Sequence, residues 1–313
     1  MVVSARGRVK AHRPRLTRRR RGRNNADRTT LTPEFLEAWM VGDRRLPSAL
    51  DRWPRIRDRL QARRLLLFLS YDGALAPLVS REDMAVLSRG MKEALRQLAG
   101  LCPTVIVSRR GRQDLASMVD IDGLYHAGSD GLDFSGPGLR GGSRAKVEWV
   151  RQVRSLAADL VQAFLGTDGV LVDPRDVSLG LQLDPAARAR SPEIERILDS
   201  VLRGYPRLQK IRDRDGLLVR PRLEWDRGRA ATRIAAELAP SGTGRIPLYA
   251  GTHPADETAF HALSAEGLTL VVGGAGSATA AHYQLQNPVE LESFLFRLSD
   301  LVRGTEEVSR RGN

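Results

Sequence analysis

Four segments of the sequence end an apolar run with side chains that could do chemistry. They are Ser70 and Asp72 after LLLFL, Ser108 after TVIV, Asp226–Arg227 after GLLVRPRLEW, and residues 251–257 after PLYA. Hydroxyl and carboxylate groups can act as nucleophiles, acids, bases or metal ligands. In an open α/β sheet, ligands and chemistry collect at the carboxyl ends of the strands, so these four segments form the candidate site.

The apolar runs predict the strands that position these residues. LLLFLS shows no polar alternation, which is typical of a strand covered on both faces, and TVIVS at 104–108 is a second such run. Segment 123–134 predicts a third strand with a glycine-bracketed turn, and strands alternate with helices again after 216. Region 141–218 differs, because two charged amphipathic helices flank the alternating strand VSLGLQL. The pattern predicts a doubly wound core interrupted by an inserted cap.

The residue patterns of the four segments resemble those of the haloacid-dehalogenase superfamily and, within it, of the trehalose-6-phosphate phosphatases. The similarity extends from about Leu46 to about Leu301. It includes stretches with no catalytic part, such as Asp114-Leu115 and SATAAHYQL before the last helix. The resemblance implies an α/β fold, namely a Rossmann-like haloacid-dehalogenase core with a parallel sheet flanked by helices, and an inserted α/β cap.

The pattern and the resemblance together predict the organisation of the chain. We expect a basic disordered tail at 1–31, a helical lead-in at 32–62, the core at 63–140 and 219–306, the cap at 141–218, and a short tail at 307–313. In the lead-in, Leu50, Trp53, Ile56 and Leu60 recur at helical spacing. These four side chains are expected to pack on the core.

The first motif departs from the family pattern, which reads Asp-Tyr-Asp-Gly-Thr. In the family, the first aspartate attacks phosphorus and ligates Mg²⁺, the second is the acid and base, and the threonine helps to hold the phosphoryl group. Here the motif is Ser70-Tyr71-Asp72-Gly73-Ala74, so Asp72 keeps the acid/base position and Ser70 replaces the nucleophile. A serine hydroxyl is a poor nucleophile without an activating base. Asp72, expected on the same strand face, is one candidate for that base.

The fourth motif loses its leading acids. The family pattern Gly-Asp-Asp-x-Thr-Asp-Glu, whose leading acids bind the metal, is matched here by Gly251-Thr252-His253-Pro254-Ala255-Asp256-Glu257. Mg²⁺ usually relies on one or two carboxylates. With Ser70, Thr252 and His253 at the metal positions, we expect no metal and no other cofactor. A transition-metal site of His253 with the Asp-Glu pair is an alternative that no second spaced histidine supports.

The phosphate-holding motifs are better kept. The family's Ser-Gly-Arg is matched by Ser108-Arg109-Arg110, and its Asp-Lys-Gly by Asp226-Arg227-Gly228. The resemblance therefore implies phosphate contacts from Ser108, Arg110 and Arg227, with a planar guanidinium in place of a compact ammonium. The Gly-Ser-His-Gly turn of the family reads Gly128-Ser129-Asp130-Gly131 here, which adds a negative charge beside the expected anion site.

Two charges in the cap match the family's sugar-contacting stretch Gly-x-x-x-Glu-x-Lys. In this chain the stretch begins at Gly169 and places Asp173 and Arg175 at the charged positions. The resemblance implies that they bind the substrate. The alternative is an exposed ion pair of little energetic value.

Composition limits the classes of protein that fit. The chain has 313 residues, one cysteine and a formal net charge of +13, and residues 1–30 hold eleven Lys and Arg against one acid. Such a tail could bind a polyanion, the only expected route to nucleic acid, or be solvated, or result from a start codon assigned too far upstream. No apolar run is long enough to span a membrane and no signal peptide is evident. We expect a cytoplasmic protein.

These observations lead to one functional expectation and one alternative. We expect a trehalose-6-phosphate phosphatase-family protein that binds a sugar phosphate such as trehalose 6-phosphate but is catalytically impaired, because the nucleophile and metal-ligand aspartates are replaced. The alternative is an active phosphatase that uses a rerouted mechanism.

Overall fold

A computed structural model describes residues 46–78, 85–140, 144–213, 216–239, 244–252, 254–273 and 279–311. The described residues lie within one compact unit, Trp39–Asn313. The basic tail, the lead-in before residue 46 and His253 lie outside them. Within the described residues, no helix has the length and apolar character needed to cross a membrane.

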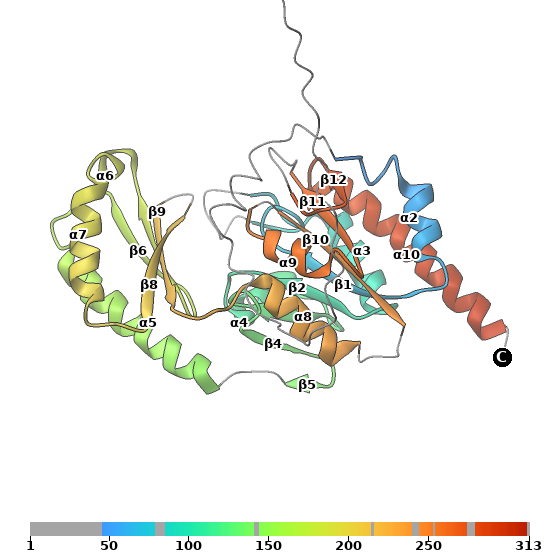
Figure 1. Ribbon diagram of the computed structural model, residues 1–313, viewed down its shortest axis with the longest axis horizontal. Coiled ribbons are helices and arrows are strands. Elements are labelled where there is room, and N and C mark those ends of the chain that lie inside the picture. The colour runs from blue at the N-terminus through green and yellow to red at the C-terminus, as the bar shows by residue number, and fades with distance from the viewer. Residues whose placement is uncertain are drawn as a thin grey trace, which may run out of the picture. The chain divides into compact units, whose positions relative to one another are not determined.

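The larger sheet has eight strands (Figure 1). Their order is β12 (Tyr283–Leu285), β11 (Leu268–Val272), β10 (Arg245–Thr252), β1 (Arg64–Ser70), β2 (Thr104–Val107), β3 (Tyr125–Gly128), β4 (Asp133–Gly136) and β5 (Leu139–Arg140). The first six run parallel, and β4 and β5 are antiparallel to their neighbours. The expected parallel sheet is confirmed, and the expected third strand with its turn is the hairpin of β3 and β4.

The central strand β1 shows why the sheet is covered on both faces. Its residues from Leu65 to Ser70 are all buried. Leu65, Leu67 and Leu69 pack into one core cluster, while the alternate residues Leu66 and Phe68 pack into another. Because successive strand residues point to opposite faces, a continuous apolar run requires a layer on each side.

Helices supply those two layers. The first cluster contains residues of α2 (Trp53–Leu60), α3 (Arg89–Ala99), α4 (Arg112–Val119) and α10 (Pro288–Arg311), and the second contains residues of α8 (Arg227–Leu238) and α9 (Glu257–Leu263). Figure 1 shows α3 and α10 on one side of the sheet and α8 on the other. The sequence prediction of a sheet flanked by helices is therefore confirmed.

The two ends of the described chain pack on this core. In α2, Ile56 and Leu60 are buried, as the helical spacing predicts, and Trp53 meets Phe294 of α10 edge-on at 5.5 Å. At the other end, the expected tail from 307 is instead a continuation of α10, which extends to Arg311.

A second sheet forms in the segment 144–221, which we call the insert. Its strands are antiparallel, in the order β6 (Val170–Pro174), β7 (Leu179–Leu183), β9 (Gly216–Pro221) and β8 (Leu208–Asp213). The helices α5 (Arg144–Ala163), α6 (Pro185–Ala189) and α7 (Ser191–Leu202) complete it, and their buried residues share a separate apolar core with alternate residues of the sheet.

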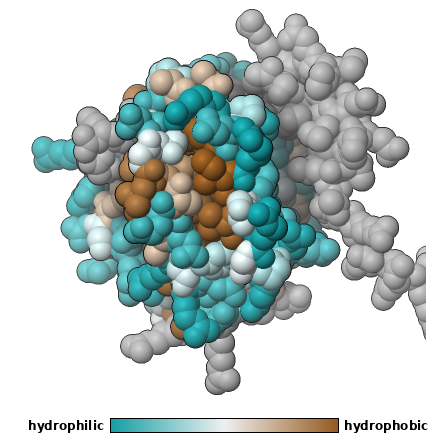
Figure 2. Space-filling view, turned by 90° about the vertical axis from the view of Figure 1, so that its left-hand side faces the viewer, coloured by the Kyte–Doolittle hydropathy of each residue, from teal (hydrophilic) through white to brown (hydrophobic). Residues whose placement is uncertain are grey.

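The expected return to the core at residue 219 is displaced. Val219 pairs with Leu179 of β7 and Lys210 of β8, so the strand remains in the second sheet as far as Pro221. The insert also exposes Val161, Leu165 and Leu171. A small apolar area surrounded by hydrophilic residues is visible on the face shown in Figure 2.

Candidate functional site

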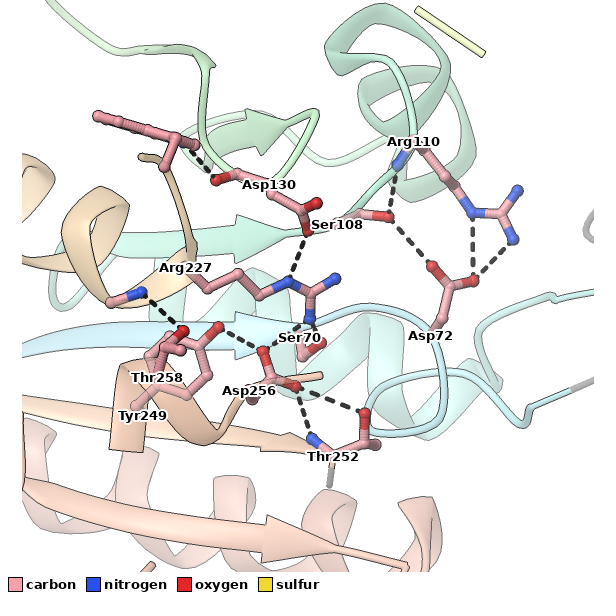
Figure 3. Close-up of polar contacts among 12 residues, drawn as sticks. Ser70, Asp72, Ser108, Arg110, Asp130, Arg227, Tyr249, Thr252, Asp256 and Thr258 are labelled. Atoms are coloured by element: carbon pink, nitrogen blue, oxygen red, sulfur yellow. Dashed lines mark hydrogen bonds and ion pairs between the residues drawn. The ribbon is translucent and has the colours of Figure 1, made fainter. Parts of the chain in front are cut away.

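The ends of β1, β2 and β10 bring most of the sequence-predicted residues together with the start of α8 (Figure 3). Helix α8 begins directly after Asp226, whose side chain caps the helix by accepting a 2.9 Å hydrogen bond from the Arg229 backbone N–H. Arg227 is thus the first helical residue, and its side chain reaches the end of β1. We call the following side chains the strand-end cluster: Ser70, Asp72, Ser108, Arg110, Asp130, Arg227, Tyr249, Thr252 and Asp256.

Arg227 lies at the centre of the strand-end cluster and is only 7% exposed. Its Nη1 donates to Ser70 Oγ at 3.0 Å and to Asp256 Oδ1 at 2.6 Å, and its Nε donates to Asp130 Oδ1 at 2.8 Å. Burial on its own would lower the pKa of Arg227, but Asp256 and Asp130 more than offset this and hold the pKa well above its usual value. Arg227 is therefore a fixed, buried cation.

Asp256 is the fully buried partner of this arginine. Besides Arg227, it accepts hydrogen bonds from the Tyr249 hydroxyl at 2.6 Å and from the Thr252 backbone N–H at 2.6 Å. Burial, and next the Asp256 charge, raise the pKa of Tyr249 well above its usual value, so Tyr249 stays a neutral donor. Both oxygens of Asp256 are thus engaged by the protein itself.

Asp72 lies in the turn that follows β1, and not within the strand as expected. Its Oδ2 accepts from Ser108 Oγ at 3.0 Å, and its Oδ1 accepts from Arg110 Nε at 3.2 Å and Nη2 at 2.7 Å. Ser70 is directed to Arg227 instead, and no Ser70–Asp72 hydrogen bond is found among the described residues. The candidate base and the candidate nucleophile therefore have different partners.

The turn after β3 is held in an uncommon backbone conformation. Ser129, Asp130 and Gly131 have φ values of 53°, 55° and 82°, and a left-handed conformation is unfavourable for the two residues that carry a Cβ. The Ser129 N–H donates to the Arg110 carbonyl at 2.8 Å, and the Asp130 N–H donates to the Ser108 carbonyl at 2.9 Å. These bonds fix the turn beside the end of β2, so that Asp130 can reach the Arg227 guanidinium.

The expected cap residues lie apart from the strand-end cluster. Asp173 is on β6 and forms an ion pair with Arg175, with Oδ2 and Nε 3.0 Å apart, and it also accepts from Gln182 Nε2 at 3.4 Å. The side chains of Asp173 and Arg175 are 30% and 12% exposed, so the pair is partly buried. Their role in substrate binding stays a prediction.

A partly open pocket lies between the insert and the core. The core side is lined by Arg109, Ser129 and Asp130, and the insert side by Ser178, Leu218 and Arg220. Trp225, in the segment that joins β9 to α8, also lines it, and its indole N–H donates to the Asp130 carbonyl at 3.0 Å. Of the described residues that were named from the sequence as site residues, none lines this pocket.

The donors present at the strand ends do not fit the Mg²⁺ ion that the family resemblance implies. Asp72 is bound by the Arg110 guanidinium and Asp256 by that of Arg227, so neither carboxylate is available to a cation. Ser70 and Thr252 offer hydroxyls only, and a buried guanidinium nitrogen already lies 3.0 Å from Ser70 Oγ. Among the described residues, no three His, Cys, Asp or Glu side chains are grouped as metal ligands would be. His253 lies outside those residues.

Sequence reasoning missed Tyr249, Trp225 and Arg220. Tyr249 stands two residues before Gly251 on β10, and this even spacing could have placed it on the face of the motif glycine. Arg220 lies on β9, which was assigned to the core from residue 219, so its position in the insert went unrecognised. Trp225 immediately precedes the Asp226 motif and gave no periodic signal.

Comparison with solved structures gives the class of fold. The C-terminal domain of the trehalose-6-phosphate phosphatase from C. albicans aligns with a TM-score of 0.65 at 18% identity, covering 83% of this chain and 99% of that one. A trehalose-6-phosphate phosphatase related protein aligns with a TM-score of 0.62 at 19% identity, covering 77% and 99%. With its parallel sheet, its strand-end motifs and its insert, this chain has the haloacid-dehalogenase-like fold.

Comparison of sequences identifies the family. The sequence model of the trehalose-phosphatase family matches residues 68–288. A probable trehalose-phosphate phosphatase from Oryza sativa subsp. japonica is 31% identical over 278 residues, which cover 87% of this chain and 75% of that protein. A second relative, trehalose-phosphate phosphatase B from Arabidopsis thaliana, is 30% identical over 280 residues, covering 86% and 74%. The chain belongs to the trehalose-phosphatase family.

Proposed function

We propose that this protein binds a phosphorylated sugar of the trehalose 6-phosphate type and hydrolyses it weakly or not at all. The observation that carries the proposal is the environment of Ser70. At the nucleophile position of the motif stands a hydroxyl whose oxygen accepts a hydrogen bond from the buried Arg227 guanidinium. The substrate class follows from the family and from the names of the relatives.

The geometry argues against efficient chemistry at Ser70. A hydroxyl becomes a useful nucleophile when a nearby base accepts its proton. Here the Ser70 oxygen faces a guanidinium, which cannot accept a proton, while the Asp72 carboxylate is held by Arg110 and Ser108. The mechanism that the family motifs imply also relies on a metal ion to neutralise the phosphoryl oxygens, and the donor set does not fit one.

The pocket beside the strand-end cluster supports a retained binding role. It combines apolar walls with a few polar groups, as ligand sites usually do. Asp173 on β6 and Arg175, which directly follows that strand, are proposed to contact the sugar from the insert side, and the protein would then be a binding member of its family.

Restoring the missing groups tests the loss of catalysis. Phosphate release from trehalose 6-phosphate would be measured with Mg²⁺ for the wild type, for Ser70→Asp/Thr252→Asp, and for the same double variant with Arg227→Lys. The structure singles out the third change, because the guanidinium already occupies the space beside Ser70. We expect negligible release from the wild type and an increase of orders of magnitude only when the smaller ammonium accompanies the two aspartates.

The competing function is an active phosphatase that uses Ser70 by a rerouted mechanism. A wild-type turnover near the ordinary value of ~10 s⁻¹ that Ser70→Ala abolishes would establish it and refute the proposal. Arg222→Gln is the control for a change of charge, because Arg222 is exposed and follows the insert sheet. Its turnover should equal that of the wild type.

A further inference from the structure

Two buried polar atoms in the pocket have no hydrogen-bond partner among the described residues. They are the Ser129 hydroxyl oxygen and Arg220 Nε. Ser129 is only 4% exposed, and both residues line the same pocket from opposite sides, one from the core turn and one from β9. Buried side-chain polar atoms in proteins nearly always have a partner, so two such atoms on residues that line one cavity point to a ligand that supplies it.

In the strand-end cluster, by contrast, the positive charge is already paired with carboxylates. Its two guanidiniums, Arg110 and Arg227, face three carboxylates. A phosphate dianion placed there would meet a group whose net charge is already negative, and it would have to break ion pairs that are largely buried. The family motif residues are thus present, but their charges are used internally.

The pocket has the opposite balance. Two guanidiniums, Arg109 and Arg220, line it against one carboxylate, Asp130, which shares the charge of Arg227 with Asp256. A guanidinium Nε in a partly enclosed pocket is a strong donor to a phosphoryl oxygen. Ser129 can donate to a second oxygen.

We propose that the phosphoryl group of the ligand binds in this pocket, at Arg220 and Ser129, and not at the strand-end motifs. This inference rests on the proposed function, that is, on the binding of a sugar phosphate. The sugar lies against Leu218 and Trp225, whose ring is fixed by the bond from its indole N–H to the Asp130 carbonyl. A bound phosphate held there is displaced from Ser70, which gives a second reason for weak hydrolysis.

The test measures binding by calorimetry, with trehalose 6-phosphate as the probe and trehalose as the phosphate-free comparison. Arg220→Gln and Ser129→Gly each remove one proposed contact, and glycine suits the positive φ at 129, so that this variant keeps its fold. Arg222→Gln removes the same charge two residues along the chain from Arg220, outside the pocket. Arg110→Gln removes a donor from the strand-end cluster. Thermal melting confirms that each variant is folded.

We expect Arg220→Gln and Ser129→Gly to raise the Kd for trehalose 6-phosphate roughly ten- to a hundredfold, the usual effect of losing a hydrogen bond to a charged group. Arg222→Gln and Arg110→Gln should change the Kd for trehalose 6-phosphate by less than about threefold, because neither side chain is a proposed contact of the ligand. Trehalose should bind weakly to all variants alike. Loss of binding in Arg110→Gln, with Arg220→Gln and Ser129→Gly unaffected, would overturn the displaced site and leave the proposed function intact. An equal loss in Arg222→Gln would also overturn it. Failure of the wild type to bind would refute the proposed function itself.

Discussion

Arg227 stands where the family motif has a lysine, and the difference in shape has wide effects. An ammonium is a compact point charge, whereas a guanidinium presents several donors in a plane. Arg227 uses Nε for Asp130 and Nη1 for both Ser70 and Asp256, and so connects three segments that are far apart in the sequence. The motif arginine has become part of the structural core.

Removing this arginine should therefore destabilise the fold. Arg227→Met leaves Asp256 buried without its cation, and breaking a buried pair in this way costs about 3–5 kcal/mol. The free energy of unfolding, measured in urea, should fall by that order, and Arg227→Met/Asp256→Asn should lose less than the sum of the single variants. Arg233→Met breaks an exposed pair with Glu237 and should cost less than about 0.5 kcal/mol. Equal costs for Arg227→Met and Arg233→Met would contradict the structural role.

A second residue-scale prediction concerns His126, whose Nε2 is buried without a partner among the described residues. Burial, with a smaller contribution from Arg112, lowers the pKa of His126 from 6.5 to about 4. The unfolded chain therefore binds more protons between these two values, and the free energy of unfolding should fall as the pH drops from about 6.5 toward 4.

Two measurements check this pH dependence. An NMR titration should show no protonation of His126 above about pH 5. The unfolding free energy should drop by about 1–2 kcal/mol more between pH 7 and pH 5 in the wild type than in His126→Gln, a range that allows for partial exposure of the ring. An ordinary titration of His126 near pH 6.5 would refute the prediction.

The residue types at the strand ends could be predicted from the sequence, but their pairing could not. Ser108, Arg110 and Asp72 do meet, as neighbouring strand ends of a parallel sheet should. The partners of Arg227 depend on the direction taken by a long side chain, and this direction is decided by Asp130 and Asp256, which come from two other segments. A motif match gives neither the direction of the Arg227 side chain nor its partners.

At the scale of elements, the turn after β3 and helix α8 depend on each other. The turn carries Asp130 to Arg227 at the start of α8, and Gly131 packs closely against the same helix. A Cβ built on Gly131 would lie 2.4 Å from the Ala230 Cβ, which is shorter than real contacts allow. Glycine is thus needed there for packing as well as for its φ of 82°.

Two matched substitutions separate these two requirements. Gly131→Ala combines an unfavourable φ with the contact on α8 and should lower the free energy of unfolding by about 2–4 kcal/mol. Gly138→Ala has a similar φ of 74° and meets nothing within 4 Å, so it should cost only about 1–2 kcal/mol. Denaturant unfolding of both variants gives the comparison. Equal losses would show that the helix contact contributes nothing.

Periodicity predicted which strands and helices form better than it predicted the residues at which they begin and end. A continuous apolar run such as LLLFL admits few structures other than a doubly covered strand, and the run is β1. The end of the insert was misplaced because β9 reads GLLVRP, an apolar run that fits a core strand equally well. Its membership in the second sheet depends on pairing with β7 and β8, which are distant in sequence.

On the scale of the whole molecule, the described residues divide their apolar cores between two sheets. The eight-stranded sheet has a cluster on each face, and the insert has its own. In the sequence the middle region changes from buried parallel strands to alternating ones, and its assignment as a cap stays a prediction. The charge distribution of residues 1–30 lies outside the described structure, and the polyanion interpretation stays a prediction.

The segment that joins β9 to α8 should provide a fluorescence signal for binding. Trp225 lies within it, donates to the Asp130 carbonyl and lines the pocket. The emission of an indole depends on the polarity around it, and this polarity would change when a sugar lies against the ring. The sequence contains four tryptophans, so the difference spectrum between wild type and Trp225→Phe isolates this one. Fluorescence would then report occupancy of the pocket directly, without a label and without turnover.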